Sequence, residues 1–399
     1  ISISIKACDL KNLKNLKNLI NLINLTNLTN LINLMNLTES HSRLLGRQEC
    51  AALRGLAILS IVLHNYCHIL SFSIKESEFT WDINETMRWG DYLKHIDSHL
   101  LINIFSWGGH YALGAFMFLT GYCLVCKYED ETHPISISTP SFVWQHYKKL
   151  VMLALVPLFA YIAMQVIIAQ YTRATILSLI AQMGMFINLF FKTLIIVPGP
   201  FWYLGMIMQV YIIYALTRPG KSRIARWLVP LVLIATHIVL HIAVPQESLT
   251  AEWLRYNAPM AFIPFALGLL AARYEPQLSL SRIAWAGIAI AMAVAVAACA
   301  FNYYLWLLNT VLAAVALIAV VKTLRGWMLQ CAETIGVFSS LIYVLHPIAR
   351  YLTTHLFNQW DHAFPHLQLL IYLTLTALAV ALYRRLRLPG THQLGNKTH

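Results

Sequence analysis

Long apolar runs constrain this chain more than any other feature of its sequence. Between residues 51 and 384, hydrophobic residues form eleven such runs, and a helix needs roughly 20 residues to cross a bilayer. Only 12% of the 399 residues are charged, against about a quarter in soluble domains. Lipid offers no hydrogen-bond partner to an open backbone, so segments that span it must be helical. The sequence therefore predicts an all-α integral membrane protein.

The basic residues between these runs indicate how the chain crosses the membrane, because Lys and Arg collect in cytoplasmic loops. The runs lie at 51–70, 101–126, 147–170, 175–197, 201–217, 226–246, 257–274, 282–301, 303–321, 333–357 and 366–384. Arg43 and Arg47 place the N-terminal end inside, and the acidic loop 71–100 then lies outside. The later basic clusters all return inside only if the run 175–197 does not span. We therefore expect about ten transmembrane helices with both termini cytoplasmic, and 175–197 interfacial or re-entrant.

The two ends of the chain differ from its apolar body. Nine x-Asn-Leu triplets fill residues 11–37, and a period of three drifts about 60° per repeat, so no apolar helix face forms. We predict that residues 1–46 are a low-complexity tail and that the native start is Met35, the first methionine. Residues 47–385 are expected to form one membrane domain, followed by a short basic cytoplasmic tail at 386–399.

Charge and cysteine usage exclude several other classes of protein. The net charge of +12 is expected from membrane topology, and no basic, aromatic-rich soluble module that would bind nucleic acid is visible. Cys123 and Cys126 form a CxxC, but no second pair or histidine cluster completes a zinc site. We therefore expect packing cysteines, no metal site and no flavin.

The first apolar run carries the densest set of polar side chains: Arg54, His64, Asn65 and His68. At about 100° per residue these four lie on one side of a helix, with Arg54 about 15 Å from His64 along the axis. Polar and ionisable groups inside a span indicate a functional site. The alternative is that Arg54 extends to the cytoplasmic surface while the histidines mark the outer interface.

Two later runs also place polar residues at membrane depth. Trp202 begins the run at 201–217, where aromatic residues are typical of the membrane interface, but Gln209 lies about two turns further in. The run at 333–357 brings Tyr343 and His346 near mid-membrane. A single histidine before a proline is equally compatible with simple packing against a neighbouring helix.

Five motifs occur in order along these runs. They are Arg54-Gly55-Leu56-Ala57; Phe116-Met117-Phe118-Leu119-Thr120-Gly121-Tyr122; Lys148, Lys149 and Pro157; Trp202, Gln209 and Tyr211; and Ser340, Tyr343, Leu345 and His346. Together they resemble the acyltransferase 3 family of bacterial integral membrane acyltransferases, over roughly residues 47–385. In that family ten residues usually separate the first-span Arg from a His, and here Asn65 stands at that position. The acyl-transfer histidine is therefore His64 or His68.

The resemblance implies a membrane acyltransferase of a bacterial plasma membrane. Its donor would be an acyl-CoA, most often acetyl-CoA, with the phosphates near Lys148, Lys149 and Arg54. His64 or His68 would deprotonate the acceptor or carry the acyl group. The other substrate-binding positions that the resemblance implies are Asn65, Trp202, Gln209, Tyr211, Tyr343 and His346.

The acceptor would be a hydroxyl of a surface polysaccharide or glycolipid. Apart from the acyl-CoA substrate no cofactor is expected, and the lipid bilayer is the other partner. The main alternative is a multi-span exporter of an acylated solute, since ten spans with inward polar groups also suit transport. A purely structural membrane protein would leave the polar side of the first span unexplained.

Overall fold

A computed structural model describes residues 44–129, 136–169, 172–190, 192–218, 222–274, 278–357 and 363–386. Contacts divide the chain into two units, one of Ile1–Gly46 with Glu275–Leu278, the other of Arg47–Tyr274 with Ser279–His399. Every helix of the described part belongs to the second unit. The predicted triplet tail, the start at Met35 and almost all of the predicted basic tail lie outside the described residues.

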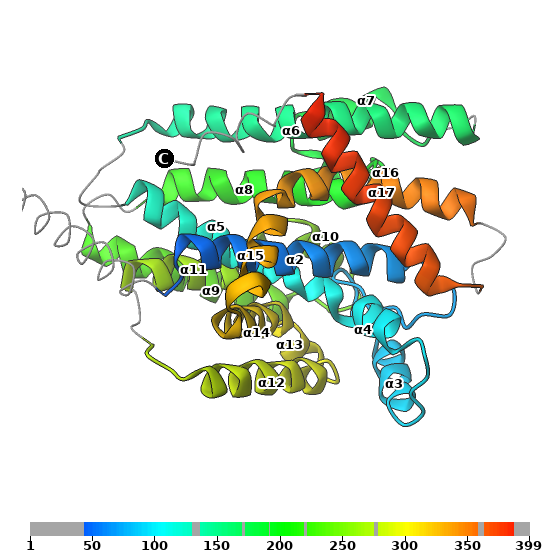
Figure 1. Cartoon of the computed structure of the whole chain (residues 1–399). Coiled ribbons are helices and arrows are strands. Elements are labelled where there is room, and N and C mark those ends of the chain that lie inside the picture. The colour runs from blue at the N-terminus through cyan, green and yellow to red at the C-terminus, as the bar shows by residue number, and fades with distance from the viewer. Residues whose placement is uncertain are drawn as a thin grey trace, which may run out of the picture. The chain divides into compact units, whose positions relative to one another are not determined.

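The described residues of the second unit are helical wherever they have regular structure (Figure 1). The α-helices are α2 (Arg47–Cys67), α3 (Ile83–Tyr92), α4 (Leu100–Gly108), α5 (Leu113–Tyr128), α6 (Thr139–Ala169), α7 (Ile176–Met183), α8 (Trp202–Thr217), α9 (Arg223–Ala243), α10 (Leu249–Tyr256), α11 (Phe262–Tyr274), α12 (Arg282–Cys299), α13 (Tyr303–Trp306), α14 (Asn309–Thr323), α15 (Gly326–Val337), α16 (Ser339–Leu356) and α17 (Pro365–Arg385). Four 3-10 turns join them: η1 (Gly109–Ala112), η2 (Ile187–Phe190), η3 (Gly199–Phe201) and η4 (Ala258–Ala261).

Seven helices among the described residues are long and apolar enough to cross a membrane. They are Arg47–Cys67, Leu100–Tyr128, Thr139–Ala169, Gly199–Thr217, Arg223–Ala243, Arg282–Cys299 and Pro365–Arg385. The pair α15 and α16, bent by 71°, makes an eighth if it is one span. Two more predicted runs form the shorter apolar helices Ala258–Tyr274 and Asn309–Thr323. The predicted count of ten is therefore not confirmed, because these two helices are shorter than a full span.

The run at 175–197 forms no spanning helix among its described residues, as the charge pattern required. Its helix α7 has eight residues, and η2 follows after a turn. The Gln182 amide holds the segment folded, since Nε2 donates to Val197 O at 2.8 Å and Oε1 accepts from Val197 N at 3.3 Å. Asn188 Nδ2 donates to Trp202 O and Tyr256 O, at 2.7 and 2.6 Å, which ties the segment to α8 and α10.

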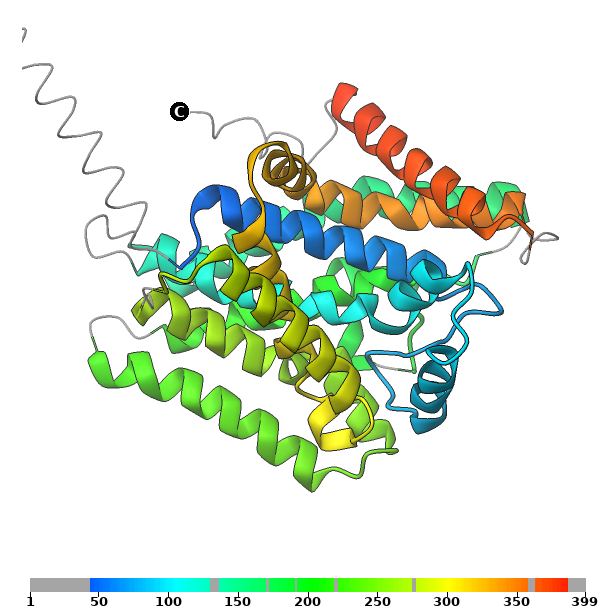
Figure 2. The same ribbon diagram turned by 60° about the horizontal axis from the view of Figure 1, so that its bottom comes forward.

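Helix α2 lies at the centre of the unit and packs closely against α15, while α16 and α17 pack against each other at one edge (Figures 1 and 2). Two glycines permit the α2–α15 contact. A Cβ at Gly55 would lie 1.9 Å from Ala332 O, and one at Gly336 would lie 1.7 Å from Ala51 O. Helices that cross this closely in a membrane depend on such small residues. The bend between α15 and α16 follows directly after this crossing.

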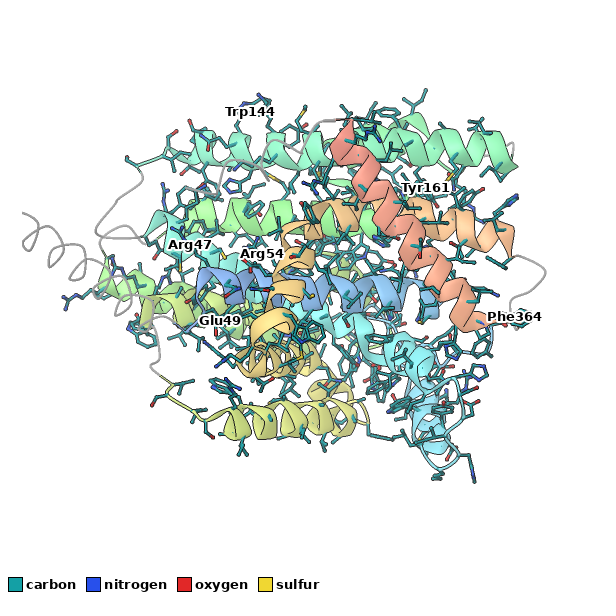
Figure 3. The ribbon with its side chains drawn as sticks, viewed as in Figure 1. Arg47, Glu49, Arg54, Trp144, Tyr161 and Phe364 are labelled. Atoms are coloured by element: carbon teal, nitrogen blue, oxygen red, sulfur yellow. The ribbon has the colours of Figure 1, made fainter. Side chains whose placement is uncertain are left out.

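Ion pairs join several helix ends on the side where α2 begins. Lys322 at the end of α14 contacts both carboxylate oxygens of Glu49, at 2.9 and 2.8 Å. Arg273 at the end of α11 makes a two-bond pair with Glu129, each bond 2.9 Å long. Figure 3 shows Arg47 and Glu49 at this same end of α2. We call this side, where α2 begins, the Arg54 side. The opposite side, where α2 ends, is the His64 side.

Candidate active site

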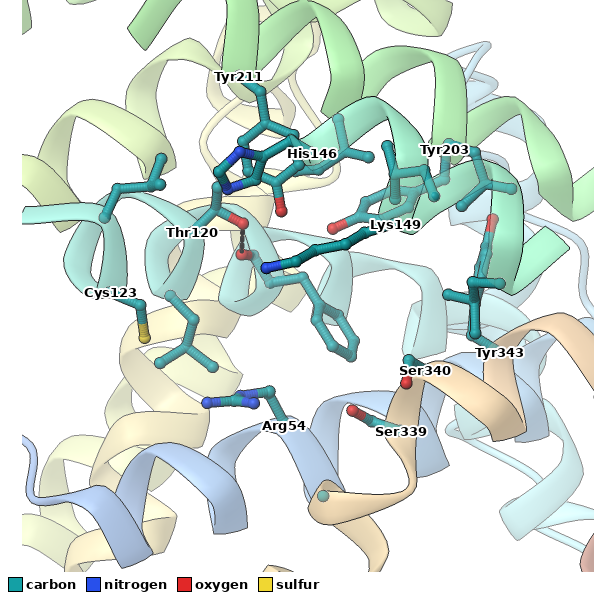
Figure 4. A pocket seen from close by; sticks show the side chains of 18 of the residues that line it. Arg54, Thr120, Cys123, His146, Lys149, Tyr203, Tyr211, Ser339, Ser340 and Tyr343 are labelled. Carbon is teal, nitrogen blue, oxygen red and sulfur yellow. Dashed lines mark hydrogen bonds between the residues drawn. The ribbon is translucent and has the colours of Figure 1, made fainter. Parts of the chain in front are cut away.

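Two adjoining cavities lie along α2. The first, the Arg54 chamber, has a volume of about 460 Å³ and is lined among others by Arg54, Thr120, Cys123, Lys127, His146, Lys149, Tyr211, Ser339 and Ser340 (Figure 4). The second, the His64 chamber, has a volume of about 290 Å³ and is lined among others by His64, Asn65, His68, Glu78, His110, Trp202, Tyr256 and Arg350. Both chambers share Ile61, Leu113, Tyr203 and Tyr343, which we call the neck.

The Arg54 chamber is a basic cavity with apolar walls. Arg54 comes from α2, Lys127 from α5 and Lys149 from α6, and no carboxylate of the described chain lines it. The Lys149 ammonium and the Arg54 guanidinium both point into the cavity in Figure 4. His146, one turn before Lys149, places its ring 4.4 Å from that of Tyr211. This arrangement can bind an anionic group attached to an apolar one.

The neck is narrowed by two tyrosines. The Tyr343 hydroxyl of α16 donates to Pro200 O, and its ring centroid lies 5.6 Å from that of Tyr203 on α8. These contacts fix both rings between the chambers. A group that reaches from one chamber to the other must pass beside them.

Three histidine rings stand in a row in the His64 chamber. The ring centroid of His64 lies 4.9 Å from that of His68 and 4.9 Å from that of His110 in η1. His64 Nδ1 lies 3.0 Å from Phe105 O and His68 Nδ1 lies 3.4 Å from Ser106 O. A carbonyl can only accept, so each Nδ1 carries the proton and each Nε2 has a free lone pair. Burial lowers the pKa of His68, which keeps that ring neutral.

Gly109 allows His110 to stand beside α2. A Cβ at Gly109 would lie 2.8 Å from the His64 Cβ and 2.9 Å from Ser60 O, so another residue would push η1 away. Ser60 Oγ also donates to Gly109 O at 3.0 Å. The backbones of α2 and η1 therefore approach closely at the histidine row.

The loop between α2 and α3 brings Glu78 to this chamber, and contacts hold the loop on both sides of that residue. Glu76 accepts hydrogen bonds from the Tyr111 hydroxyl and, at 2.5 Å, from Trp306 Nε1. Phe79 stacks on Tyr256, with centroids 3.8 Å apart and planes at 8°. Desolvation raises the pKa of Glu78 to about 7 and that of Glu76 to about 8.

Two arginines complete the surroundings. Arg255, which is 2% exposed, donates to Phe79 O and, at 2.9 Å, to the Tyr303 hydroxyl. Arg350 of α16 lines the chamber itself and donates to Asn65 O and Oδ1, at 3.2 and 3.1 Å. Asn65, at the position where the family usually has histidine, therefore holds Arg350 in place.

The structure brings most of the predicted site residues together. Arg54, Lys149 and Tyr211 line the Arg54 chamber; His64, Asn65, His68 and Trp202 line the His64 chamber; Tyr343 lines both. Three others do not line either chamber. Lys148 is exposed, and His346 is fully buried with Nδ1 3.3 Å from Ile342 O. Gln209 uses its amide to bind Asn257 Oδ1 at 2.7 Å and Ala258 N at 2.9 Å, joining α8 to η4.

Four site residues were missed by the sequence reasoning: Lys127, Glu78, His110 and Arg350. His110 had a usable signal, since it is an ionisable residue inside an apolar run, next to a Gly-Gly pair. Glu78 had none, because it is one of several acidic residues in a polar loop.

The comparisons with known proteins agree with this geometry. The family model Acyl_transf_3, described as an acyltransferase domain, matches residues 51–384. No curated protein and no solved structure matches the chain. The match covers nearly all of the described helices, including both chambers. The chain therefore belongs to the acyltransferase 3 family and is a membrane acyltransferase.

Proposed function

We propose that this protein transfers an acetyl group from acetyl-CoA to a hydroxyl of a cell-surface carbohydrate or glycolipid. The observation that carries the proposal is the pair of chambers joined by one neck. One chamber is basic and the other holds the histidines, and both lie along the polar side of α2. The multi-span exporter finds no support in the family match.

The donor would occupy the Arg54 chamber. Coenzyme A carries several phosphates on a nucleotide and a long, largely uncharged pantetheine arm. Arg54, Lys127 and Lys149 offer positive charge to the phosphates, and the apolar wall suits the arm. The two tyrosine rings at the neck would favour a short acyl chain such as acetyl. Lys148 does not line this chamber, and Lys127 would take its role.

The Arg54 side would face the cytoplasm of a bacterial cell. The ends of α11 and α14 bring Arg273 and Lys322 to this side, and Lys and Arg collect on the cytoplasmic face of membrane proteins. An acyl-CoA made in the cytoplasm would then enter from its own compartment. The His64 chamber would open toward the outer face of the plasma membrane, where surface glycans are assembled.

The acceptor would bind in the His64 chamber. Trp202 and Tyr256 offer aromatic surface, and Arg350 offers hydrogen-bond donors to sugar oxygens. His64 or His68 would take the hydroxyl proton through Nε2 as the oxygen attacks the thioester carbonyl carbon. The carbon–sulfur bond breaks, the CoA thiolate leaves, and the proton passes to its sulfur. Acyl-CoA and alcohol thus give ester and free CoA.

The test is acyl transfer in membranes that contain the full chain. Radiolabelled acetyl-CoA is supplied with native surface glycan, and label is followed in glycan and in protein. Loss of transfer in His64→Ala or His68→Ala, with protein level unchanged, would support the proposal. Transfer that survives both substitutions would refute this site. A solute that crosses the membrane without covalent change would instead favour the exporter.

A further inference from the structure

Three ligand-type side chains converge at the floor of the His64 chamber. One ring nitrogen of His64, one of His110 and one carboxylate oxygen of Glu78 all lie within 4.8 Å of one another. They come from α2, η1 and the α2–α3 loop. Two histidines and a carboxylate are a donor set typical of zinc and related divalent transition metals.

The hydrogen bonding of these groups is incomplete. His110 is 1% exposed, and neither of its ring nitrogens has a partner among the described residues. A direct His–Glu pair would join Glu78 to one of these nitrogens, yet both remain unbonded. A buried polar group without a partner costs about 1–3 kcal/mol, so a bound species is expected here.

The orientation of His64 matches that of a metal ligand. Its Nδ1 donates to Phe105 O at 3.0 Å, which leaves Nε2 facing the chamber. Metal-binding histidines regularly donate their second nitrogen to a carbonyl or carboxylate in this way. Gly109, by allowing the close approach described above, sets His110 beside that nitrogen.

Glu78 is held from both sides, although it lies in a loop. Glu76 is bonded to Tyr111 and Trp306, and Phe79 is fixed by Arg255 and Tyr256. The side chain of Glu78 is then the part that can adjust. Zinc ligands bond at roughly 2.0–2.2 Å, so the three atoms must draw closer around an ion.

The outer face of His110 meets a second, smaller cavity. This space of about 20 Å³ is lined by His110, Glu78, His237, His241 and Arg255, and it is large enough for about one water. His237 and His241 donate through Nδ1 to Pro259 O and His237 O, each at 2.8 Å, and both Nε2 atoms lack partners in the described chain. A water in this cavity would donate hydrogen bonds to both Nε2 atoms and accept one from the remaining N–H of His110.

We propose that His64, His110 and Glu78 bind a divalent transition-metal ion of the zinc class, with an open coordination position facing the His64 chamber. The inference deepens the proposed function, because the open position faces the site given to the acceptor hydroxyl. Such an ion lowers the pKa of a bound hydroxyl and stabilises developing negative charge on oxygen. With His64 engaged as a ligand, His68 is the free ring that takes the proton.

The test measures metal content and needs no activity. The full chain is purified in detergent without chelator, incubated with Zn²⁺, desalted, and analysed by mass spectrometry of its metals. We expect about one ion per chain, as a site of this donor set would hold. His110→Ala and Glu78→Gln should lose most of it. His146→Ala, which changes a buried histidine of the other chamber, should keep it.

The outcomes separate this inference from the proposed function. If wild type holds no more zinc, cobalt or manganese than His110→Ala, a metal site is overturned and an ordered water occupies the cluster. Glu78→Gln keeps the shape of the side chain, and gel filtration checks that the variants remain folded. Acyl transfer by a protein free of metal would refute the role of the ion and leave the proposed function standing. Bound metal in a protein that transfers no acyl group would support the metal site and refute the proposed function.

Discussion

The Arg54 chamber and the His64 chamber are built in different ways. The cations of the Arg54 chamber come from three helices, α2, α5 and α6. The His64 chamber takes its polar groups from α2, a loop, a 3-10 turn and α16. The first chamber is thus built from regular helices alone, whereas the second also depends on how a loop and a 3-10 turn are placed against the helices.

This difference has a chemical consequence. Exposed or partly exposed cations such as Lys149 attract an anion but leave its position loosely defined. The histidine row, in contrast, has each Nδ1 held by a carbonyl and a loop fixed on both sides of Glu78. Under the proposed function, the donor binds in one chamber and proton transfer takes place in the other. The following substitutions probe this difference between the chambers and the contacts that hold the fold around them.

Replacing His68 by Ala should reduce acyl transfer most. Loss of a general base typically lowers kcat by about 10²–10⁴-fold, and KM for acyl-CoA should hardly change because His68 lies in the other chamber. Steady-state kinetics with membranes of equal protein content would measure both constants. His95→Ala, an exposed histidine on the same side, is the control and should be fully active. A changed KM with unchanged kcat would contradict this difference between the chambers.

Replacing Gly336 by Ala should destabilise the fold on the Arg54 side. The new Cβ would meet Ala51 O at 1.7 Å, so α15 must move from α2. Overpacking of this kind costs about 1–3 kcal/mol or more and should lower the melting temperature in detergent by several degrees. Gly287→Ala is the matched control, since no atom lies within 4 Å of its Cβ. Equal melting temperatures for the two variants would show that the close crossing is not needed.

Replacing Lys149 by Ala should weaken donor binding alone. Removal of one cation from the Arg54 chamber should raise KM for acyl-CoA by about 10-fold, equivalent to about 1.4 kcal/mol, and leave kcat nearly unchanged. Lys148→Ala is the neighbouring control, because Lys148 is exposed and does not line the chamber. If the Lys148 variant shows the larger rise, the phosphates bind on the surface and not in the chamber.

The smallest expected effect concerns Asp97 in the α3–α4 loop. Hydrogen bonds from the Tyr92 hydroxyl and from His99 lower the pKa of Asp97 to about 2. Because the folded pKa lies below the unfolded value of 3.8, the carboxylate stabilises the protein above that value, and this contribution is lost as pH falls toward 2. Asp97→Asn should therefore melt slightly below wild type at pH 6 and converge with it as the pH falls toward 2. A difference in melting temperature that grows as the pH falls would contradict the lowered pKa of Asp97.

Local patterns in the sequence were enough to establish the class of protein and the polar side of α2. Apolar runs and the cost of an open backbone in lipid require membrane helices, and the period of α2 aligns Arg54 with Asn65 and His68. The resemblance to the acyltransferase 3 family, confirmed over residues 51–384, indicated acyl transfer as the reaction type. These conclusions rest on local pattern, which does not depend on how helices pack.

Which polar residues meet depends instead on how the helices and loops pack. Gln209 had the spacing of a site residue, but its amide binds Asn257 because α8 packs on η4. Glu78 and His110 are separated by 32 positions along the chain. Gly109 lets His110 approach His64, and hydrogen bonds from Arg255 and Trp306 hold the loop that carries Glu78. The number of spans also depends on packing, because the chain bends by 71° between α15 and α16, directly after α15 crosses α2. Long-range contacts of this kind have no period in the sequence, and so the His64 chamber could not be read from it.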